Sequence, residues 1–215
     1  MTFASETALV NSALVKLGEE RITSLSSDTS RRAVVARQQY PIQRDNVLRK
    51  YRWNFAIGRA SLAQLATAPA FGFDYAYTLP DDCLKFIGIY DQHQSKANYT
   101  ATAIIHKIES QDTSTVLLCD EDTVDAVYIR QITNTLLFDP NFGEYLAWVL
   151  AADLATYLTT GPEAFRRCSA VAKQALKEAK EANAFESTPE VIEASDWVDS
   201  RERGSQMRNA GWTRN

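Results

Sequence analysis

The sequence predicts an α+β protein with helices at both ends of the chain and strands in its middle. Apolar residues recur at helical spacing up to about residue 56 and again over 141–184, whereas they alternate with a period of two over 60–135. Beyond Phe185 the periodicity ends, and a polar segment with two tryptophans follows. A chain of 215 residues, 45% of them apolar, can bury a sizeable core without disulfides or metals.

The first helix is predicted over residues 5–17. Ser5 is a favoured N-cap, and Gly18 tolerates the left-handed backbone with which many helices end. The residues between them place four apolar side chains at helical spacing, namely Leu9, Ala13, Leu14 and Leu17.

A longer amphipathic helix is predicted over residues 30–56, after a loop that offers several N-caps. Its apolar face carries side chains at seven-residue intervals, namely Val34, Pro41, Leu48 and Phe55. Pro41 has no N–H to donate to the helix, so we expect a kink there or two helices end to end.

The middle of the chain is predicted to form antiparallel strands. Residues 75–79 and 83–89 alternate in polarity on either side of the turn Pro80-Asp81-Asp82, which predicts a hairpin. Further strands are expected at 100–107, 115–119 and 125–131. Antiparallel pairing is expected because no connection here is long enough to carry a crossover helix.

Two more helices are predicted, over residues 141–158 and 162–184. Gly161 and Pro162 stand in the order that ends one helix and begins the next. The last helix presents a stripe of small apolar residues, which permits close approach of a neighbouring helix.

Composition argues against several classes of protein. No run approaches the roughly 20 apolar residues of a membrane-spanning helix, and the N-terminus lacks the pattern of a signal peptide. We therefore expect that the protein is synthesised in the cytoplasm and does not associate with membranes.

Cys83, Cys119 and Cys168 form an odd set that suits neither a disulfide framework nor zinc knuckles, so we interpret them as small buried hydrophobes.

Charge is segregated along the chain, although the net charge is only −4. Residues 28–59 contain eight basic and two acidic residues, whereas 184–200 contains five acids and no base. Residues 201–215 are basic again, with four arginines and one glutamate. Segregation of this kind is typical of contact surfaces.

The sequence offers no constellation that predicts catalysis, a cofactor or a metal. The eight glycines never cluster as a phosphate-binding loop requires. His93 and His106 have no Cys or second His at ligand spacing, so a surface or structural role is favoured over a metal or general-base role. For the acidic run 120–122 a solvated turn is favoured over a cation site, and Cys119 beside it has no evident activating base.

The basic second helix allows two interpretations. Its arginines fall between the apolar positions, as a solvated helix face requires, and this is the favoured interpretation. The alternative is contact with an acidic surface, either a neighbouring copy or nucleic acid. Because the chain itself supplies carboxylates over 186–199, self-association would satisfy both segments. The candidate subunit-interface residues are Arg37, Arg44, Arg49 and Arg52.

Several segments together resemble the tail tubular protein A, or head-to-tail adaptor, family of short-tailed bacteriophages. The segments follow in the same order over most of the chain: ALVNSALVKLGEERITSLSSDTS, YPIQRDNVLRKYRWNFAIGRASL, YAYTLPDDCLKFIGIY, VYIRQITNTLLFDPNFGEYLAWVLAADLATYLT and SDWVDSR. The combination of Arg44-Asp45, Trp53-Asn54-Phe55-Ala56 and Tyr77-Thr78-Leu79-Pro80 is the most specific part. The final GSQMRNAGWTRN extends past the family pattern.

The resemblance implies a non-enzymatic virion protein at the head–tail junction. Its copies would form a dodecameric ring between the portal protein and the tail nozzle, through which DNA passes without sequence-specific binding; tail fibres are a further candidate partner. The implied domains are a helix bundle from 1–59 and 136–185, an inserted antiparallel β domain at 60–135 and an extended C-terminal arm at 186–215.

We further expect roles for aromatic and basic residues at the domain junction and in the C-terminal arm. Trp53 and Phe55 are expected to seal the junction between helices and β domain. In the arm, the candidate portal-interface residues are Trp197, Arg201, Arg203, Arg208, Trp212 and Arg214. The alternative function is a nucleic-acid-binding module that uses the Arg-rich second helix, which a salt-dependent affinity for DNA would distinguish.

Overall fold

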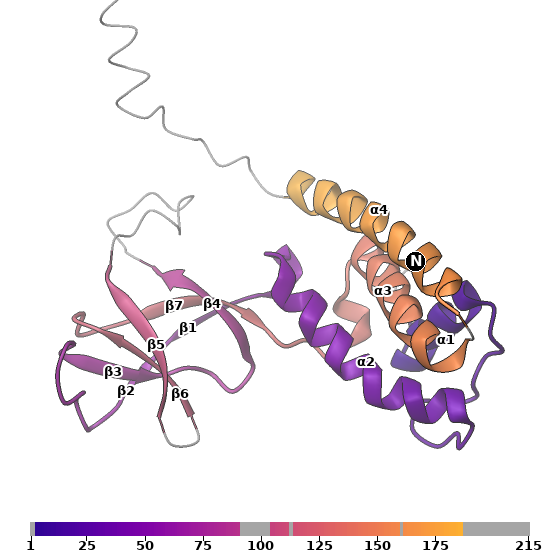
Figure 1. The fold of residues 1–215 in the computed structure, drawn as a ribbon. Helices are drawn as coiled ribbons and strands as arrows, with labels where there is room; N and C mark the ends of the chain where they lie inside the picture. The colour runs from indigo at the N-terminus through magenta and orange to yellow at the C-terminus, as the bar shows by residue number, and fades with distance from the viewer. Residues whose placement is uncertain (1–2, 91–103, 112–113, 160, 187–215) are drawn as a thin grey trace, which may run out of the picture.

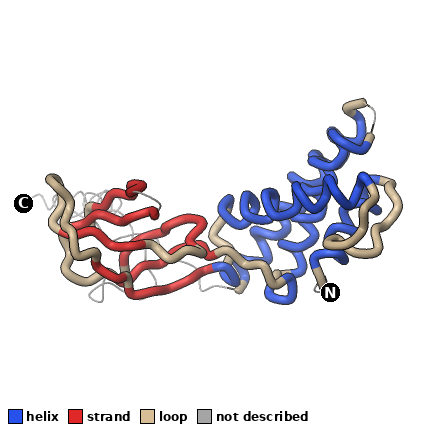
Figure 2. Tube along the Cα trace, turned by 90° about the horizontal axis from the view of Figure 1, so that it is seen from below, coloured by secondary structure: helices blue, strands red, loops and turns tan. Residues whose placement is uncertain are grey.

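The computed structural model describes residues 3–90, 104–111, 114–159 and 161–186. These residues form an α+β structure of four helices and two antiparallel sheets. The helices come from the two ends of the chain and gather at one end of the molecule, whereas the strands gather at the other (Figures 1 and 2). The α+β class predicted from the sequence is therefore confirmed.

Helix α1 spans Glu6–Leu17, as predicted. The Ser5 hydroxyl accepts a hydrogen bond from the Ala8 N–H at 3.1 Å, which satisfies one of the unpaired donors at the helix start. At the other end Gly18 has a φ of 91°, a left-handed conformation that costs glycine little.

Helix α2 spans Arg31–Lys50 and begins at the N-cap Ser30. Pro41 lies inside this single helix, so the alternative of two helices end to end is wrong. The helix also stops six residues before the predicted end at 56, because Tyr51 is extended and Asn54–Ala56 forms a 3₁₀ turn. This early end brings Trp53 into the core, where its Nε1 donates to the Val47 carbonyl at 3.0 Å.

Helices α3 (Pro140–Leu158) and α4 (Glu163–Phe185) match their predicted positions closely. Asp139 caps α3 by accepting from the N–H groups of Asn141 and Phe142 at 2.8 and 3.1 Å. Helix α3 is the central one, since it packs against α1, α2 and α4. Its many buried alanines and leucines follow from that position.

The strands form two sheets, one in the order β1-β7-β4 and one in the order β2-β3-β6-β5. The bounds are β1 Ile57–Ser61, β2 Ala63–Gln64, β3 Tyr75–Thr78, β4 Cys83–Ile89, β5 His106–Gln111, β6 Ser114–Cys119 and β7 Asp125–Arg130. Strands β6 and β7 confirm the predicted segments, and every pairing is antiparallel as expected. Half of the strand predicted at 100–107 lies outside the described residues, and its residues 106 and 107 begin β5. Strands β1 and β2 were not predicted.

The predicted hairpin of residues 75–79 and 83–89 is wrong. Strand β3 pairs with β2 and β6, whereas β4 pairs with β7 in the other sheet. The turn Pro80–Asp82 therefore passes the chain from one sheet to the other. Strand β7 is buried over Ala126–Ile129 and takes the central place in its sheet, which leaves an edge for β4.

Two main clusters make up the core. The larger one runs through all four helices and continues into the β1-β7-β4 sheet through Ile129. A second cluster lies between the two sheets and contains residues of both, among them Tyr77, Ile89 and Leu117. The helices and the nearer sheet thus share one apolar core.

Candidate functional site

The basic face of α2 divides into arginines that serve the fold and arginines that remain at the surface. Arg44 is only 6% exposed, and its Nε donates to Asp45 Oδ1 at 2.8 Å. Asp45 in turn accepts from the Gln131 amide at 2.7 Å, which links α2 to the chain after β7. The Arg44 guanidinium is therefore largely shielded from solvent by contacts within its own chain.

Arg37 is exposed, but its guanidinium holds the loop before α2. Its Nε donates to the Leu25 carbonyl at 2.7 Å, and one terminal nitrogen donates to the Asp28 carbonyl at 2.8 Å. Arg31 donates to the Tyr157 carbonyl in the last turn of α3, and Arg32 donates to Glu20 in the loop after α1. Part of the basic pattern therefore stabilises loops, a use that residue spacing does not reveal.

The last two candidate subunit-interface residues, Arg49 and Arg52, lie at or just after the end of α2. Arg49 is exposed, and Arg52 is half-buried in the segment that leaves the helix. The Arg52 carbonyl accepts from the Asn183 amide at 3.2 Å. Arg49 is thus the candidate whose exposure best fits a contact with another molecule.

Trp53 and Phe55 lie between the end of α2 and the start of β1. Trp53 is buried at 1% exposure, and Phe55 is half-buried. Their rings meet Phe142 of α3 edge-on, with centroid separations of 5.1 and 4.9 Å. Phe138 completes the cluster at 6.0 Å from Phe55. This aromatic cluster fixes the end of α2 against the start of α3.

A groove of about 310 Å³ lies between α2 and α4, over α3. Lys50 of α2 and Lys173 of α4 stand on its two sides. Its other lining residues are mainly apolar: Tyr145, Val149, Ala152, Phe165, Ala172 and Leu176, with Gln43, Asp153 and Ser169. Phe165 keeps 44% of its surface exposed, which is much for a large apolar residue next to a groove.

Asp153 is the unusual polar group of this groove. Burial raises the pKa of its carboxyl group, and a hydrogen bond with Gln43 opposes that shift. Its Oδ2 atom is buried and has no hydrogen-bond partner among the described residues. A buried oxygen of this kind favours a donor from outside the described fold.

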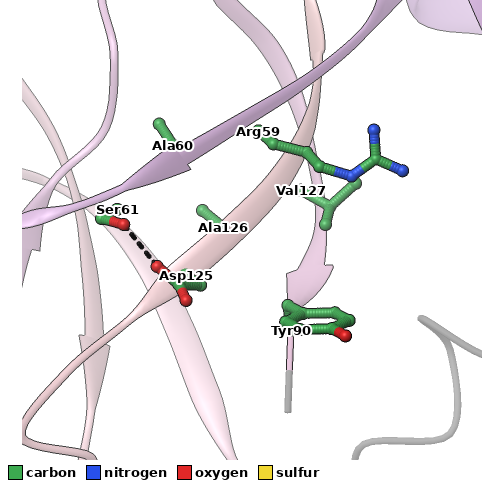
Figure 3. Close-up of a pocket in the computed structure, with 7 residues that line it drawn as sticks. All are labelled: Arg59, Ala60, Ser61, Tyr90, Asp125, Ala126 and Val127. Carbon is green, nitrogen blue, oxygen red and sulfur yellow. Dashed lines mark hydrogen bonds between the residues drawn. The ribbon is translucent and has the colours of Figure 1, made fainter. Parts of the chain in front are cut away.

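A second pocket, of about 410 Å³, lies beside β1 and β7 and is lined by Arg59, Ala60, Ser61, Tyr90, Asp125, Ala126 and Val127 (Figure 3). The Ser61 hydroxyl donates to the Asp125 carboxylate at one side, and the Arg59 and Tyr90 side chains lie at the other. Among the described residues, no histidine or cysteine lines this pocket.

Neither His106 nor the acidic run 120–122 lines either hollow. His106 is exposed on β5, where its ring meets Phe86 at 5.1 Å. The acidic run 120–122 is exposed after β6, and within the described part of the chain no three His, Cys, Asp or Glu side chains gather as metal ligands. His93 lies outside the described residues.

Two of the three cysteines fit the interpretation as buried hydrophobes. Cys119 and Cys168 are buried, whereas Cys83 is only half-buried. Burial raises the pKa of the Cys83 and Cys119 thiols, which disfavours the reactive thiolate.

The six arm residues proposed for a portal interface, from Trp197 to Arg214, lie outside the described residues. None of the helices in the described ranges combines the length and the apolar composition of a membrane-spanning segment.

No protein-family model matches the chain, and a search of curated proteins found no match either.

Proposed function

We propose that the chain is a non-enzymatic structural protein of a bacteriophage virion, a head-to-tail adaptor that joins the portal to the tail nozzle. In this proposal the protein is synthesised in the host cytoplasm, and twelve copies form a ring in the tail of the virion. The observation that carries this proposal is the ordered resemblance to the tail tubular protein A family over most of the sequence.

The arrangement of elements is compatible with the architecture that the resemblance implies. In the proposal, residues 1–59 and 136–185 form a helix bundle around α3, residues 60–135 form an inserted β domain, and 186–215 form an arm. The aromatic cluster of Trp53 and Phe55 would then stiffen the joint between bundle and β domain.

Ring formation needs two different complementary faces on each subunit. Helix α2 carries six basic residues and one acidic residue, whereas residues 184–200 carry five acids and no base. Charge complementarity of this kind sets register and partner choice more than affinity. A net charge of −4 also suits a channel wall that lets DNA pass, since every phosphate contact would retard its exit.

The proposal is tested by negative-stain imaging of the purified protein mixed with the portal of the same virus, together with analysis of purified tails. We expect rings on the portal and the protein at the head–tail junction. A protein that stays monomeric with portal and is absent from tails would contradict the proposal.

The alternative, a nucleic-acid-binding module, is tested by DNA binding at several salt concentrations. Arg49→Ala and Arg52→Ala are the informative variants, because changes at Arg37 and Arg44 would also disturb contacts within the fold. A salt-dependent affinity that both variants abolish would favour this alternative over the adaptor.

A further inference from the structure

We propose that the acidic segment 186–199 of the free subunit folds back along α4 and occupies the groove between α2 and α4 of its own chain. The inference concerns the free protein and does not require the adaptor role.

The charge of the groove favours an acidic occupant. Lys50 and Lys173 stand on its two sides, and both side chains lie at the exposed surface. The flanking helices are basic overall, since α2 has six bases and one acid and α4 has five bases and three acids. Segment 186–199 contains five acids and no base: Glu186, Glu190, Glu193, Asp196 and Asp199. Charge complementarity therefore selects this segment from the parts of the chain outside the described fold.

The lining of the groove also matches the remaining side chains of the segment. Phe165 is 44% exposed at the groove, and Val149 and Leu176 contribute further apolar surface. The segment brings Val191, Ile192, Trp197 and Val198, of which a tryptophan alone buries on the order of 200 Å². Covering the groove would remove both apolar surfaces from water.

Asp153 supplies an independent observation. Its buried Oδ2 has no partner among the described residues, and leaving such an acceptor unpaired is costly. Over residues 195–199 the segment carries two side-chain donors, the Ser195 hydroxyl and the Trp197 indole N–H. Either donor would satisfy the carboxylate oxygen.

The chain is long enough for this return path. With a helix rise of about 1.5 Å per residue, Leu176 lies about 14 Å and Phe165 about 30 Å back from Phe185, where α4 ends. An extended chain advances about 3.3 Å per residue, so Trp197 can reach up to about 40 Å from Phe185. A short tether also gives the segment an effective concentration in the millimolar range, which favours its own groove over that of a second copy.

The test is zero-length carbodiimide cross-linking of the full chain, with an equal mixture of unlabelled and ¹⁵N-labelled protein. Mass spectrometry then identifies the lysines joined to carboxylates of 190–199 and the isotopes of the two joined peptides. We expect cross-links at Lys50 or Lys173 at least five times as often as at the exposed control Lys85, and only between peptides with the same label. Mixed-label pairs would assign the groove to a second copy, and cross-linking no greater than at Lys85 would show that the segment does not occupy it. Either result overturns the proposal.

Variants with reversed charges provide the second part of the test. Lys173→Glu should reduce the cross-links formed at Lys50 at least five-fold, and adding Glu193→Lys should restore them. Lys177→Glu is the matched control, since Lys177 lies on the same helix but not in the groove, and it should change little. An equal loss in Lys173→Glu and Lys177→Glu would contradict specific docking. Because no portal is present, these outcomes are independent of the adaptor proposal.

Discussion

Asn183, near the end of α4, binds Asn54 through two hydrogen bonds although 129 residues separate them. The Asn183 Oδ1 accepts from the Asn54 N–H at 2.8 Å, and the Asn183 carbonyl accepts from the Asn54 side-chain amide at 2.7 Å. The Asn183 amide donates to the Arg52 carbonyl as well. One side chain thus fastens the last helix to the segment through which the chain enters its first strand.

Asn183→Ala should lower the free energy of unfolding by about 1–3 kcal/mol, because it removes the side-chain bonds and leaves their partners partly buried. Chemical denaturation measures this difference. Gln174→Ala is the control on the same helix, where the exposed side chain donates to Glu178, and it should cost at most about 0.5 kcal/mol. Equal effects of the two changes would contradict a specific role for Asn183.

Trp53→Ala should cost about 3–5 kcal/mol, since it removes a fully buried ring from the aromatic cluster and the hydrogen bond to Val47. Thermal or denaturant unfolding of the full chain provides the measurement. Phe71→Ala serves as control, because Phe71 is 90% exposed. A loss below about 1 kcal/mol for Trp53→Ala would show that the ring does not seal the junction.

Arg44 and Arg49 should separate folding from assembly. Arg44→Ala should destabilise the monomer by about 2–3 kcal/mol, because it leaves Asp45 without its charged partner next to Gln131. Arg49→Ala should change monomer stability by no more than about 0.5 kcal/mol, since Arg49 is exposed, but it should weaken self-association. Denaturation and analytical ultracentrifugation measure the two quantities. Similar stability losses in both variants would contradict the division.

Asp28 should make stability depend on pH in the acid range. Its carboxylate accepts from the Ser30 N–H at 2.8 Å and from the Thr23 N–H at 3.1 Å, and these bonds lower its pKa from 3.8 to about 2. A depressed carboxyl pKa adds stability above the unfolded value, and that contribution is lost as the pH falls from about 4 to about 2.

The direct measurement is the Asp28 carboxyl titration followed by NMR, with an expected midpoint near pH 2. Asp28→Asn should also lower stability at pH 7, and the difference from the unchanged protein should shrink as the pH falls below 4. A midpoint near 3.8 would mean that the carboxylate does not hold the loop.

The arm should contribute to docking and not to the fold. Trp197→Ala, or deletion from Asp196 onward, should leave the helix signal in circular dichroism nearly unchanged while binding to portal weakens. The reason is that α1 to α4 already share one core over residues 6–185. A large loss of helix signal in the shortened chain would place the arm within the core instead.

Local signals were sufficient for most helices. Ser5 and Gly18 bound α1 as their chemistry requires, and α3 and α4 follow the apolar spacing. The end of α2 was predicted wrongly because periodicity does not show how the last turn is satisfied: the Trp53 side chain, past the helix, donates to the Val47 carbonyl.

Strand existence was easier to predict than strand partnership. The alternation at Tyr75–Thr78 and Cys83–Ile89 identifies two strands, but pairing depends on β6 and β7, which come later in the chain. Turn residues alone suggested a hairpin, whereas long-range pairing placed the strands in different sheets.

The candidate site was predicted only in part for a similar reason. Spacing marked the arginines of α2 as a surface set, but it could not show that Arg44 turns inward. A usable signal was present, since Tyr40 precedes Arg44 by one helical turn and its ring lies 5.9 Å from the guanidinium. The groove at Asp153 is lined by residues of three helices that are far apart in the chain, so no local sequence pattern indicates it.

The mass of the complex formed with portal tests the central claim most directly. Twelve chains of 24.1 kDa would add about 290 kDa to the portal in native mass spectrometry, as a closed ring requires. A portal whose mass is unchanged after incubation with the protein would contradict the account.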